Sequence, residues 1–260
     1  MLELGEGVNP ISGGNFTQQG FQATRTAPGH PIGAFYGYVV DGIYQNQSEV
    51  DADGRSEAQP GDFRFKDLNG DGQLTDEDRT YLGTYQPDFE YGLNFSGSYE
   101  RFDFSFFIQG VQGNELWNAK KFQFILDNAG GNKITDVMDA WTPDNTDTNI
   151  PRATLTDPAN NKRASSFFVE NGSYLRLKSL QVGYTLPTSA LEKISSIASL
   201  SSVKLYARAQ NLLTITNYSG YDPEVGRNSG FRNTGLFGQG VDTNAHPHPK
   251  TYTLGIDISF

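Results

Sequence analysis

The chain has 260 residues, of which 36% are apolar, 19% are charged and 13% are aromatic, and it contains 29 glycines. This mixture is rich in turn-forming and β-forming residues, which excludes an all-helical fold, and its aromatic content excludes intrinsic disorder. The net charge of −10 argues against nucleic acid as a partner, and the absence of cysteine excludes a disulfide framework and a cysteine nucleophile.

Six segments show the alternation of apolar and polar residues that is typical of β-strands. They span residues 34–45, 91–99, 102–109, 175–186, 203–210 and 251–260. In the fourth segment the apolar face slips by one residue near Lys178 and Ser179, which predicts a β-bulge there.

Short and long connections alternate between these segments. Glu100 and Arg101 form a tight turn and residues 187–202 a short link with one helical turn, whereas the links 47–88, 113–172 and 215–249 are long and polar. Such alternation is typical of a membrane β-barrel, with short turns on one side of the membrane and long loops on the other. The sequence contains no run of about 18 apolar residues and therefore predicts no transmembrane helix. Strands of about 9–11 residues, however, are long enough to cross a bilayer.

Several motifs resemble, in collinear order from about Gly29 to Phe260, the C-terminal part of SusC/RagA-type TonB-linked outer-membrane proteins. They are Gly33-Ala34-Phe35-Tyr36-Gly37-Tyr38, Asp41-Gly42-Ile43-Tyr44-Gln45, Gly61-Asp62, Asp67-Leu68-Asn69-Gly70-Asp71-Gly72, Pro87-Asp88-Phe89-Glu90-Tyr91-Gly92, Gln109-Gly110-Val111-Gln112-Gly113-Asn114, Glu170-Asn171-Gly172-Ser173-Tyr174-Leu175-Arg176-Leu177, Ala209-Gln210-Asn211-Leu212, Gly220-Tyr221-Asp222-Pro223-Glu224 and the closing Phe260. The ordered set is specific even though no single motif is.

The resemblance implies an all-β fold: an antiparallel transmembrane β-barrel segment, about the last six strands of a 22-stranded barrel, with long extracellular loops. It implies a partial upstream segment at residues 1–28 and barrel strands and loops at 29–260, with no plug domain, TonB-contacting segment or signal peptide in this sequence. The expected function is therefore that of part of a bacterial outer-membrane, TonB-dependent transporter, not of an enzyme.

The same resemblance implies the partners of such a transporter. They are a SusD-like surface lipoprotein, an oligosaccharide or peptide substrate, outer-membrane lipid, the remaining barrel strands and plug, and TonB acting through the part that this sequence lacks. Because six strands cannot close a barrel wide enough for a glycan, we expect the chain to depend on those other strands. The resemblance also implies that Phe260 serves as the signal for barrel assembly.

Residues 67–78 match the spacing of a twelve-residue calcium loop. The predicted oxygen ligands are the side chains of Asp67, Asn69, Asp71 and Asp78 and the carbonyl group of Gln73, with a sharp turn at Gly72. Aspartate replaces the usual glutamate at the last position, which predicts a weaker Ca²⁺ site. The alternative is an acidic loop held by Asx turns without metal.

Aromatic residues in the long links are candidates for ligand binding, since aromatic faces suit the apolar C–H faces of sugar rings. The candidates are Trp117, Trp141, Tyr218 and Tyr221. The alternative is that these rings pack the loops together or contact a partner protein.

The alternative function is a secreted, soluble β-sandwich module that binds calcium and carbohydrate. Such a module would bury its apolar strand faces in a shared core. No motif for nucleophilic or phosphate chemistry is present in the sequence.

Overall fold

The computed structural model describes residues 7–16, 21–126, 131–194, 200–225, 235–243 and 245–260. The chain forms two compact units. The first is built from the described residues of Met1–Gln86, Asn114–Asn171 and Tyr218–Ala245, and the second from Pro87–Gly113, Gly172–Asn217 and His246–Phe260. We call them the loop unit and the strand unit. None of the described helices is long and apolar enough to cross a lipid bilayer.

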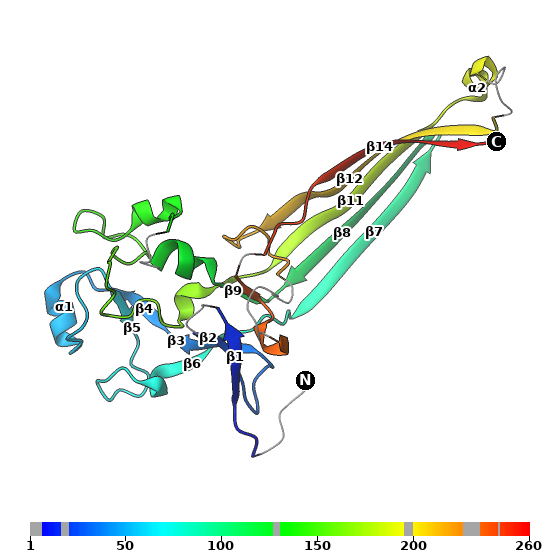
Figure 1. The fold of residues 1–260 in the computed structure, drawn as a ribbon. Helices are drawn as coiled ribbons and strands as arrows, with labels where there is room; N and C mark the ends of the chain where they lie inside the picture. The colour runs from blue at the N-terminus through cyan, green and yellow to red at the C-terminus, as the bar shows by residue number, and fades with distance from the viewer. Residues whose placement is uncertain (1–6, 17–20, 127–130, 195–199, 226–234, 244) are drawn as a thin grey trace. The chain divides into compact units, whose positions relative to one another are not determined.

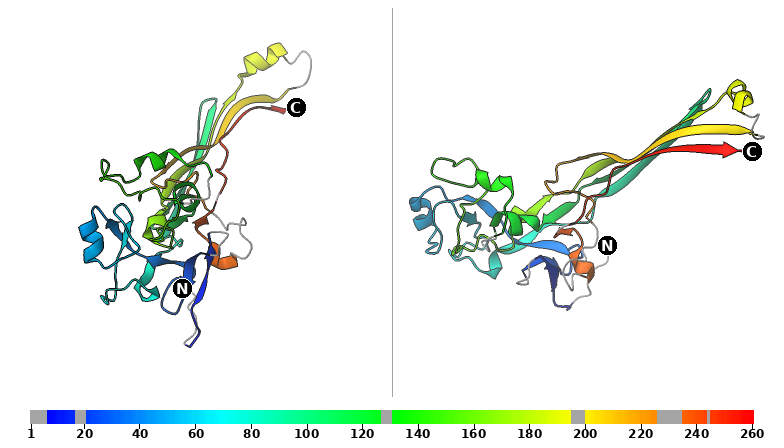
Figure 2. Two further views of the ribbon diagram at one scale, coloured as in Figure 1. Left: turned by 60° about the vertical axis from the view of Figure 1, so that its left-hand side comes forward. Right: turned by 45° about the horizontal axis from the view of Figure 1, so that its top comes forward.

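The strand unit is one antiparallel sheet of five long strands that lie side by side (Figures 1 and 2). Its spatial order is β14-β12-β11-β8-β7. The strands are β7 (Phe89–Tyr99), β8 (Phe102–Gln112), β11 (Tyr174–Thr185), β12 (Ser202–Thr216) and β14 (Thr251–Ser259). Five of the six predicted strands are thereby confirmed, as is the antiparallel, mostly β architecture.

Local features of this sheet also agree with the sequence. The register of β11 with both neighbours shifts between Leu177 and Ser179, which confirms the bulge. A two-residue turn joins β7 to β8, and Glu100 in it has a positive φ of 53°. The link between β11 and β12 contains the short helix α2 (Thr188–Ile194).

The two kinds of connection leave opposite ends of the sheet. Phe102 pairs with both Tyr99 and Tyr184, so the short links lie at one end of the sheet, where Ser202 also pairs with Ser259 of β14. The long segments that follow β8 and β12 leave from the other end. The predicted alternation of short and long connections therefore corresponds to two distinct ends of one sheet.

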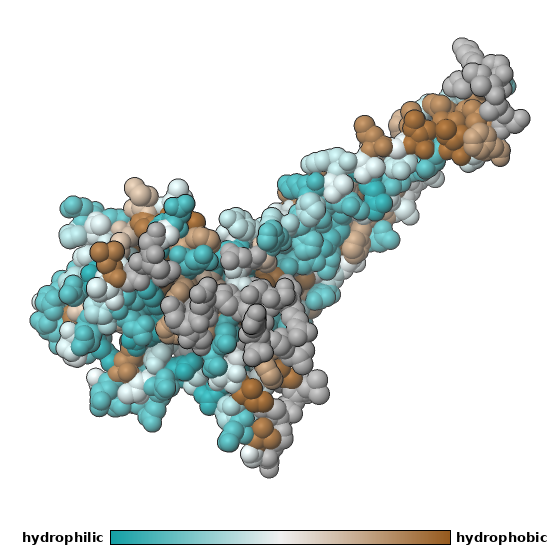
Figure 3. All heavy atoms as spheres, in the orientation of Figure 1, coloured by the Kyte–Doolittle hydropathy of each residue, from teal (hydrophilic) through white to brown (hydrophobic). Residues whose placement is uncertain are grey.

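The sheet has one apolar and one polar face. Phe95, Phe106, Leu180, Ala209 and Tyr252 align across all five strands on the apolar face. Leu254 is 86% exposed and Leu93 is 55% exposed, and Figure 3 shows apolar side chains gathered at the end of the sheet that carries the C-terminus. No second layer of the described residues buries this face.

The opposite face carries polar residues in the same register. Ser96, Ser105, Gln181, Arg208 and Thr253 form one row across the sheet. In the neighbouring rows Lys204 and Asp103 form an ion pair with an N–O distance of 2.8 Å above Gly183. A side chain at Gly183 would collide with both charged groups, so glycine there permits the ion pair to bridge β8 and β12.

The loop unit contains three small sheets and several short helices. One sheet has the order β1-β2-β3-β6, a second is the pair β4-β5, and the third has the order β10-β9-β13 with β13 parallel to β9. The strands are β1 (Ile11–Asn15), β2 (Gln22–Thr26), β3 (Ala34–Tyr38), β4 (Val40–Ile43), β5 (Phe63–Phe65), β6 (Arg79–Gly83), β9 (Glu115–Asn118), β10 (Val169–Asn171) and β13 (Val241–Asp242). The helices are α1 (Gln47–Ala52), η1 (Asp76–Asp78), η2 (Phe122–Leu126), η3 (Thr135–Asp139), η4 (Ser166–Phe168) and η5 (Gly235–Gly238).

The prediction of one long strand at 34–45 is wrong. The segment divides into β3 and β4, which join different sheets. The physical reason is a close backbone approach at Gly37: a Cβ atom there would collide with the carbonyl group of Ala164, and the Tyr38 N–H donates to that carbonyl oxygen over 2.9 Å. The pairing of β2 with β3 places the described residues on both sides of residue 28 in one unit, and the division into an upstream segment and a barrel segment stays a prediction.

Aromatic side chains form the main core of the loop unit. Trp117 is fully buried and stacks on Phe168, with their ring centroids 5.2 Å apart, and Phe16 and Phe35 pack against the same indole. Burying rings of this size supplies much of the hydrophobic stabilisation of so small a unit. The long predicted loops are thus folded structures with a core of their own.

Candidate functional site

Glu170 joins three segments of the loop unit. Its carboxylate lies 2.8 Å from the Lys121 ammonium group, and it accepts hydrogen bonds from Asn118 Nδ2 and from both the N–H and the hydroxyl group of Ser219. Burial would raise the pKa of Glu170, but the charge of Lys121 and these hydrogen bonds outweigh burial and lower it. Glu170 is therefore held ionised as the centre of a polar cluster.

Lys120 connects a second carboxylate, that of Asp242, to Tyr221. Asp242 is fully buried, and its Oδ2 atom accepts a hydrogen bond of 2.6 Å from the Tyr218 hydroxyl group and lies 2.8 Å from Lys120 Nζ. Burial and the neighbouring negative charge of Asp242 raise the pKa of Tyr218, so its hydroxyl group stays a donor. The Lys120 ammonium group lies 4.2 Å from the centre of the Tyr221 ring, which fixes that ring by a cation–π contact.

The four aromatic residues predicted to bind ligand differ in how far their side chains are exposed to solvent. Trp117 and Tyr218 are 0% and 5% exposed, and Trp141 is 8% exposed and donates its indole N–H to Gln45. These three rings are buried, which agrees with the alternative that they pack the loops together, and a role for them in ligand binding stays a prediction. Tyr221 is 72% exposed, so a ligand-binding role for it stays a prediction.

The predicted calcium loop folds around Asx turns. Asp67 accepts from the N–H groups of Gly70 and Gly72, and Asn69 and Asp71 accept from the N–H groups two residues further on. Asp78 is fully buried and accepts from Leu68 and Thr75. Burial would raise the pKa of Asp78, but the backbone N–H donors outweigh it and lower the pKa. The donor set suits Ca²⁺, and these turns also match the metal-free alternative.

Calcium binding at residues 67–78 stays a prediction. The double variant Asp67→Asn, Asp71→Asn removes two charged ligands and is expected to abolish calcium heat in calorimetry, whereas unmutated protein should bind at roughly 10⁻⁴–10⁻³ M. Asp76→Asn is the matched control, because Asp76 lies in the same loop outside the ligand set and its side chain is 88% exposed. Absence of calcium heat from unmutated protein at millimolar metal would leave only an acidic loop held by Asx turns.

Asp62, in the predicted Gly61-Asp62 motif, organises a further buried network. Its carboxylate accepts from Arg152 Nε over 2.8 Å, from Asn161 Nδ2 over 3.0 Å and from the Gln59 N–H over 2.9 Å. Since Asp62 is fully buried, removing it would leave a guanidinium and an amide group without this acceptor. The motif therefore has a structural role.

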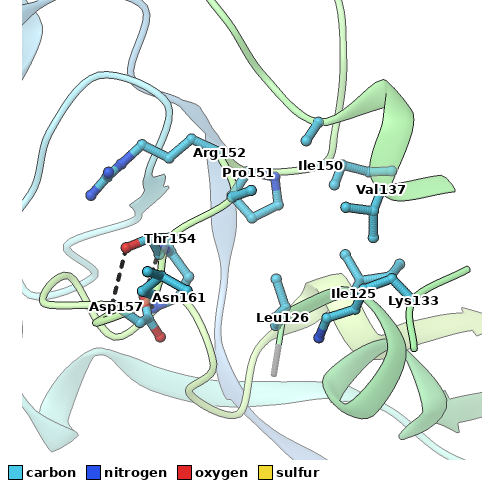
Figure 4. Close-up of a pocket in the computed structure, with 13 residues that line it drawn as sticks. Ile125, Leu126, Lys133, Val137, Ile150, Pro151, Arg152, Thr154, Asp157 and Asn161 are labelled. Carbon is cyan, nitrogen blue, oxygen red and sulfur yellow. Dashed lines mark hydrogen bonds between the residues drawn. The ribbon is translucent and has the colours of Figure 1, made fainter. Parts of the chain in front are cut away.

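A cavity of about 310 Å³ opens beside this network. Figure 4 shows Ile125, Leu126, Val137 and Ile150 on one side of it, and Asn161 bonded to Asp157 on the other. The surface of the cavity is mainly apolar. The side-chain amide of Asn161 is already hydrogen-bonded to Asp62 and Asp157.

Comparison with known proteins gives the relationship of the chain. TonB-dependent receptor P3 of Formosa agariphila is 37% identical over 249 residues, which cover 95% of this chain and 24% of that protein. TonB-dependent receptor SusC of Bacteroides thetaiotaomicron is 26% identical over 226 residues, or 86% of this chain and 20% of SusC. No protein-family model matches the sequence.

A solved structure of the RagAB peptide transporter matches with a TM-score of 0.71 and 25% identity, covering 99% of this chain and 25% of that one. The chain thus spans about a quarter of the length of the proteins it matches. Their names describe receptors and transporters, which agrees with the prediction that the chain is not an enzyme. Sequence similarity over nearly the whole chain, together with the fold, identifies it as a barrel segment of the SusC/RagA-type TonB-dependent receptor family.

Proposed function

We propose that the strand unit forms part of the wall of an outer-membrane, TonB-dependent transporter and that the loop unit lies on its extracellular side. The observation that carries the proposal is the sheet with one exposed apolar face and one polar face. In a transmembrane barrel the apolar face contacts lipid and the polar face lines the lumen, so both faces of this sheet have a partner.

The sheet edges support the same proposal. Within the described residues β7 and β14 each pair with one neighbour, which leaves the backbone groups on their outer sides available for further strands. Unsatisfied N–H and C=O groups cost several kcal/mol each in lipid. Other strands of a larger barrel, of about 22 strands in this family, would satisfy them.

The names of the relatives suggest a substrate and a protein partner for the proposed transporter. We infer an oligosaccharide or a peptide as the substrate and a SusD-like lipoprotein as the partner at the extracellular side. The proposed transporter also includes a plug domain and acts together with TonB. An anchoring role for Phe260 in barrel assembly also stays a prediction; its side chain is 82% exposed after the end of β14.

Fractionation of cells that produce the protein separates the proposal from the soluble module. We expect it in the outer-membrane pellet, released by detergent but not by high salt, because contact with lipid is hydrophobic and not electrostatic. Its gel mobility should change on heating, as the barrel unfolds. A soluble, monodisperse protein without detergent would contradict the proposal and favour the calcium- and carbohydrate-binding module.

A further inference from the structure

Three arginines and three aromatic rings alternate in one continuous stack in the loop unit. Arg25 and Arg79 lie over the Tyr36 ring at 4.6 and 4.7 Å from its centre. The stack continues through Tyr38 to Arg163, whose guanidinium carbon lies 5.1 Å from the Tyr38 ring centre and 4.8 Å from that of Phe65. Side chains from five separate segments thus meet in a single array.

This stack leaves guanidinium edges available. Of the three arginines, only Arg79 forms an ion pair with a carboxylate of the described residues, and that partner, Asp76, is largely exposed. Arg163 donates from Nε and Nη2 to two backbone carbonyl oxygens, of Asn160 and Ala159, and no bond to its Nη1 occurs within the described part of the chain. Stacking occupies the faces of a guanidinium group, while its N–H donors point outward in the plane.

The stack ends at a cavity of about 360 Å³. Arg163 and Phe65 line this cavity, together with Arg55 and Phe63. We call it the arginine pocket. Burial lowers the pKa of Arg163, and the positive charge of Arg55 acts in the same direction against the opposing effects of Tyr38 and Asp157. Two partly desolvated cations beside one cavity gain most from an anion that enters it.

Among the described residues, no carboxylate forms a hydrogen bond with either arginine of the pocket. Asp53 forms an ion pair with Arg55, with 3.8 Å between its Oδ2 atom and Arg55 Nε, which is longer than a hydrogen bond. The same carboxylate accepts a hydrogen bond from the Tyr44 hydroxyl group. Glu57 is exposed in the pocket lining and makes no ion pair with either arginine among the described residues. Both guanidinium groups therefore keep N–H donors that no carboxylate of the described residues takes up in a hydrogen bond.

We propose that the arginine pocket binds the carboxylate group of an acidic ligand, with the rings of Phe63 and Phe65 against its carbon skeleton. A planar guanidinium group binds a carboxylate through two parallel hydrogen bonds. The cavity volume fits a single sugar ring or one amino-acid side chain with its backbone. The inference rests on the proposed function in one respect: it takes the acidic ligand to be the substrate that the transporter imports.

The carboxylate has two chemical sources, an acidic sugar or an acidic peptide, and calorimetry distinguishes them. The probes are a glucuronic acid disaccharide and a Glu-Glu dipeptide, with cellobiose and a Gln-Gln dipeptide as neutral counterparts. The detergent-solubilised full-length receptor should bind one acidic probe at least about tenfold more tightly than its neutral counterpart, because a charge-assisted pair contributes more than a neutral hydrogen bond.

Variants test the assignment to the pocket. Arg55→Gln should weaken binding of that probe about tenfold or more, and Arg163→Lys should do the same because the ammonium group cannot form the two parallel bonds. Arg64→Gln is the matched control: Arg64 pairs with Asp41 on the surface of the same unit and lies outside the pocket and the stack. Its affinity should equal that of unmutated protein.

Two results would overturn the inference: failure of unmutated receptor to bind either acidic probe, or equal affinities in Arg55→Gln and unmutated protein. Arg55 contributes no ring contact to the stack, so its variant keeps the test decisive even where Arg163→Lys disturbs folding. Loss of probe binding by a receptor that still fractionates with the outer membrane would refute the pocket and leave the transporter proposal standing.

Discussion

Leu93→Arg is expected to prevent stable insertion of the proposed transporter into the outer membrane. Leu93 lies near the middle of β7, pairs with Ile108 and is 55% exposed on the apolar face. An arginine at the bilayer midplane of a barrel costs roughly 2–4 kcal/mol on the lipid side. The measurement is the fraction of heat-modifiable, folded protein in isolated outer membranes.

Asn94→Arg is the matched control for this change. Asn94 is the next residue of the same strand, so its side chain points to the polar face, where it pairs in register with Phe107. The same charge facing a wet lumen is expected to leave insertion near the unmutated level. Equal loss of folded protein in both variants would show that the two faces of the sheet do not differ in environment.

The strands could be predicted from the sequence because the signal is local. The two-residue repeat of a β-strand puts Tyr252, Leu254, Ile256 and Ile258 on one face, independently of the tertiary structure. The slip that predicts the bulge at Lys178 and Ser179 is equally local. The same rule failed at 34–45, where the apolar and aromatic composition suits a strand but contact of Gly37 with Ala164, far away in the sequence, divides it.

The burial of the loop aromatics could not be predicted from local pattern. Trp117 is buried because β9 pairs with both β10 and β13, which lie far along the chain from it. Apolar residues such as Leu116 and Phe122 stand near Trp117 among polar ones such as Asn118 and Lys120, and they show neither the alternation of a strand nor the period of a helix. A long polar link was therefore interpreted as an open loop, although its few rings converge on one cluster.

The arginine pocket could not be predicted from local sequence either. Arg55 is an isolated basic residue and Arg163 follows Lys162 in an acidic chain, and neither lies in a longer charge run or a known motif. Their association depends on how β5 and the segment around Ala159 fold. By contrast, the spacing at 67–78 did predict a compact acidic loop, because Asx turns form between residues two or three apart.

Labelling of single cysteines measures the proposed orientation of the strand unit in the membrane. This chain contributes no cysteine of its own. Thr146→Cys lies in the loop unit and is exposed, and Arg101→Cys lies in the exposed turn between β7 and β8. A membrane-impermeant maleimide added to intact cells, before and after permeabilisation of the outer membrane, reports which side each residue occupies.

We expect Thr146→Cys to be labelled in intact cells and Arg101→Cys to be labelled only after permeabilisation. Labelling of Arg101→Cys after permeabilisation serves as the control that this turn is accessible to the reagent. Equal labelling of both cysteines in intact cells, or labelling of Arg101→Cys alone, would contradict a sheet that crosses the outer membrane with its long segments outside.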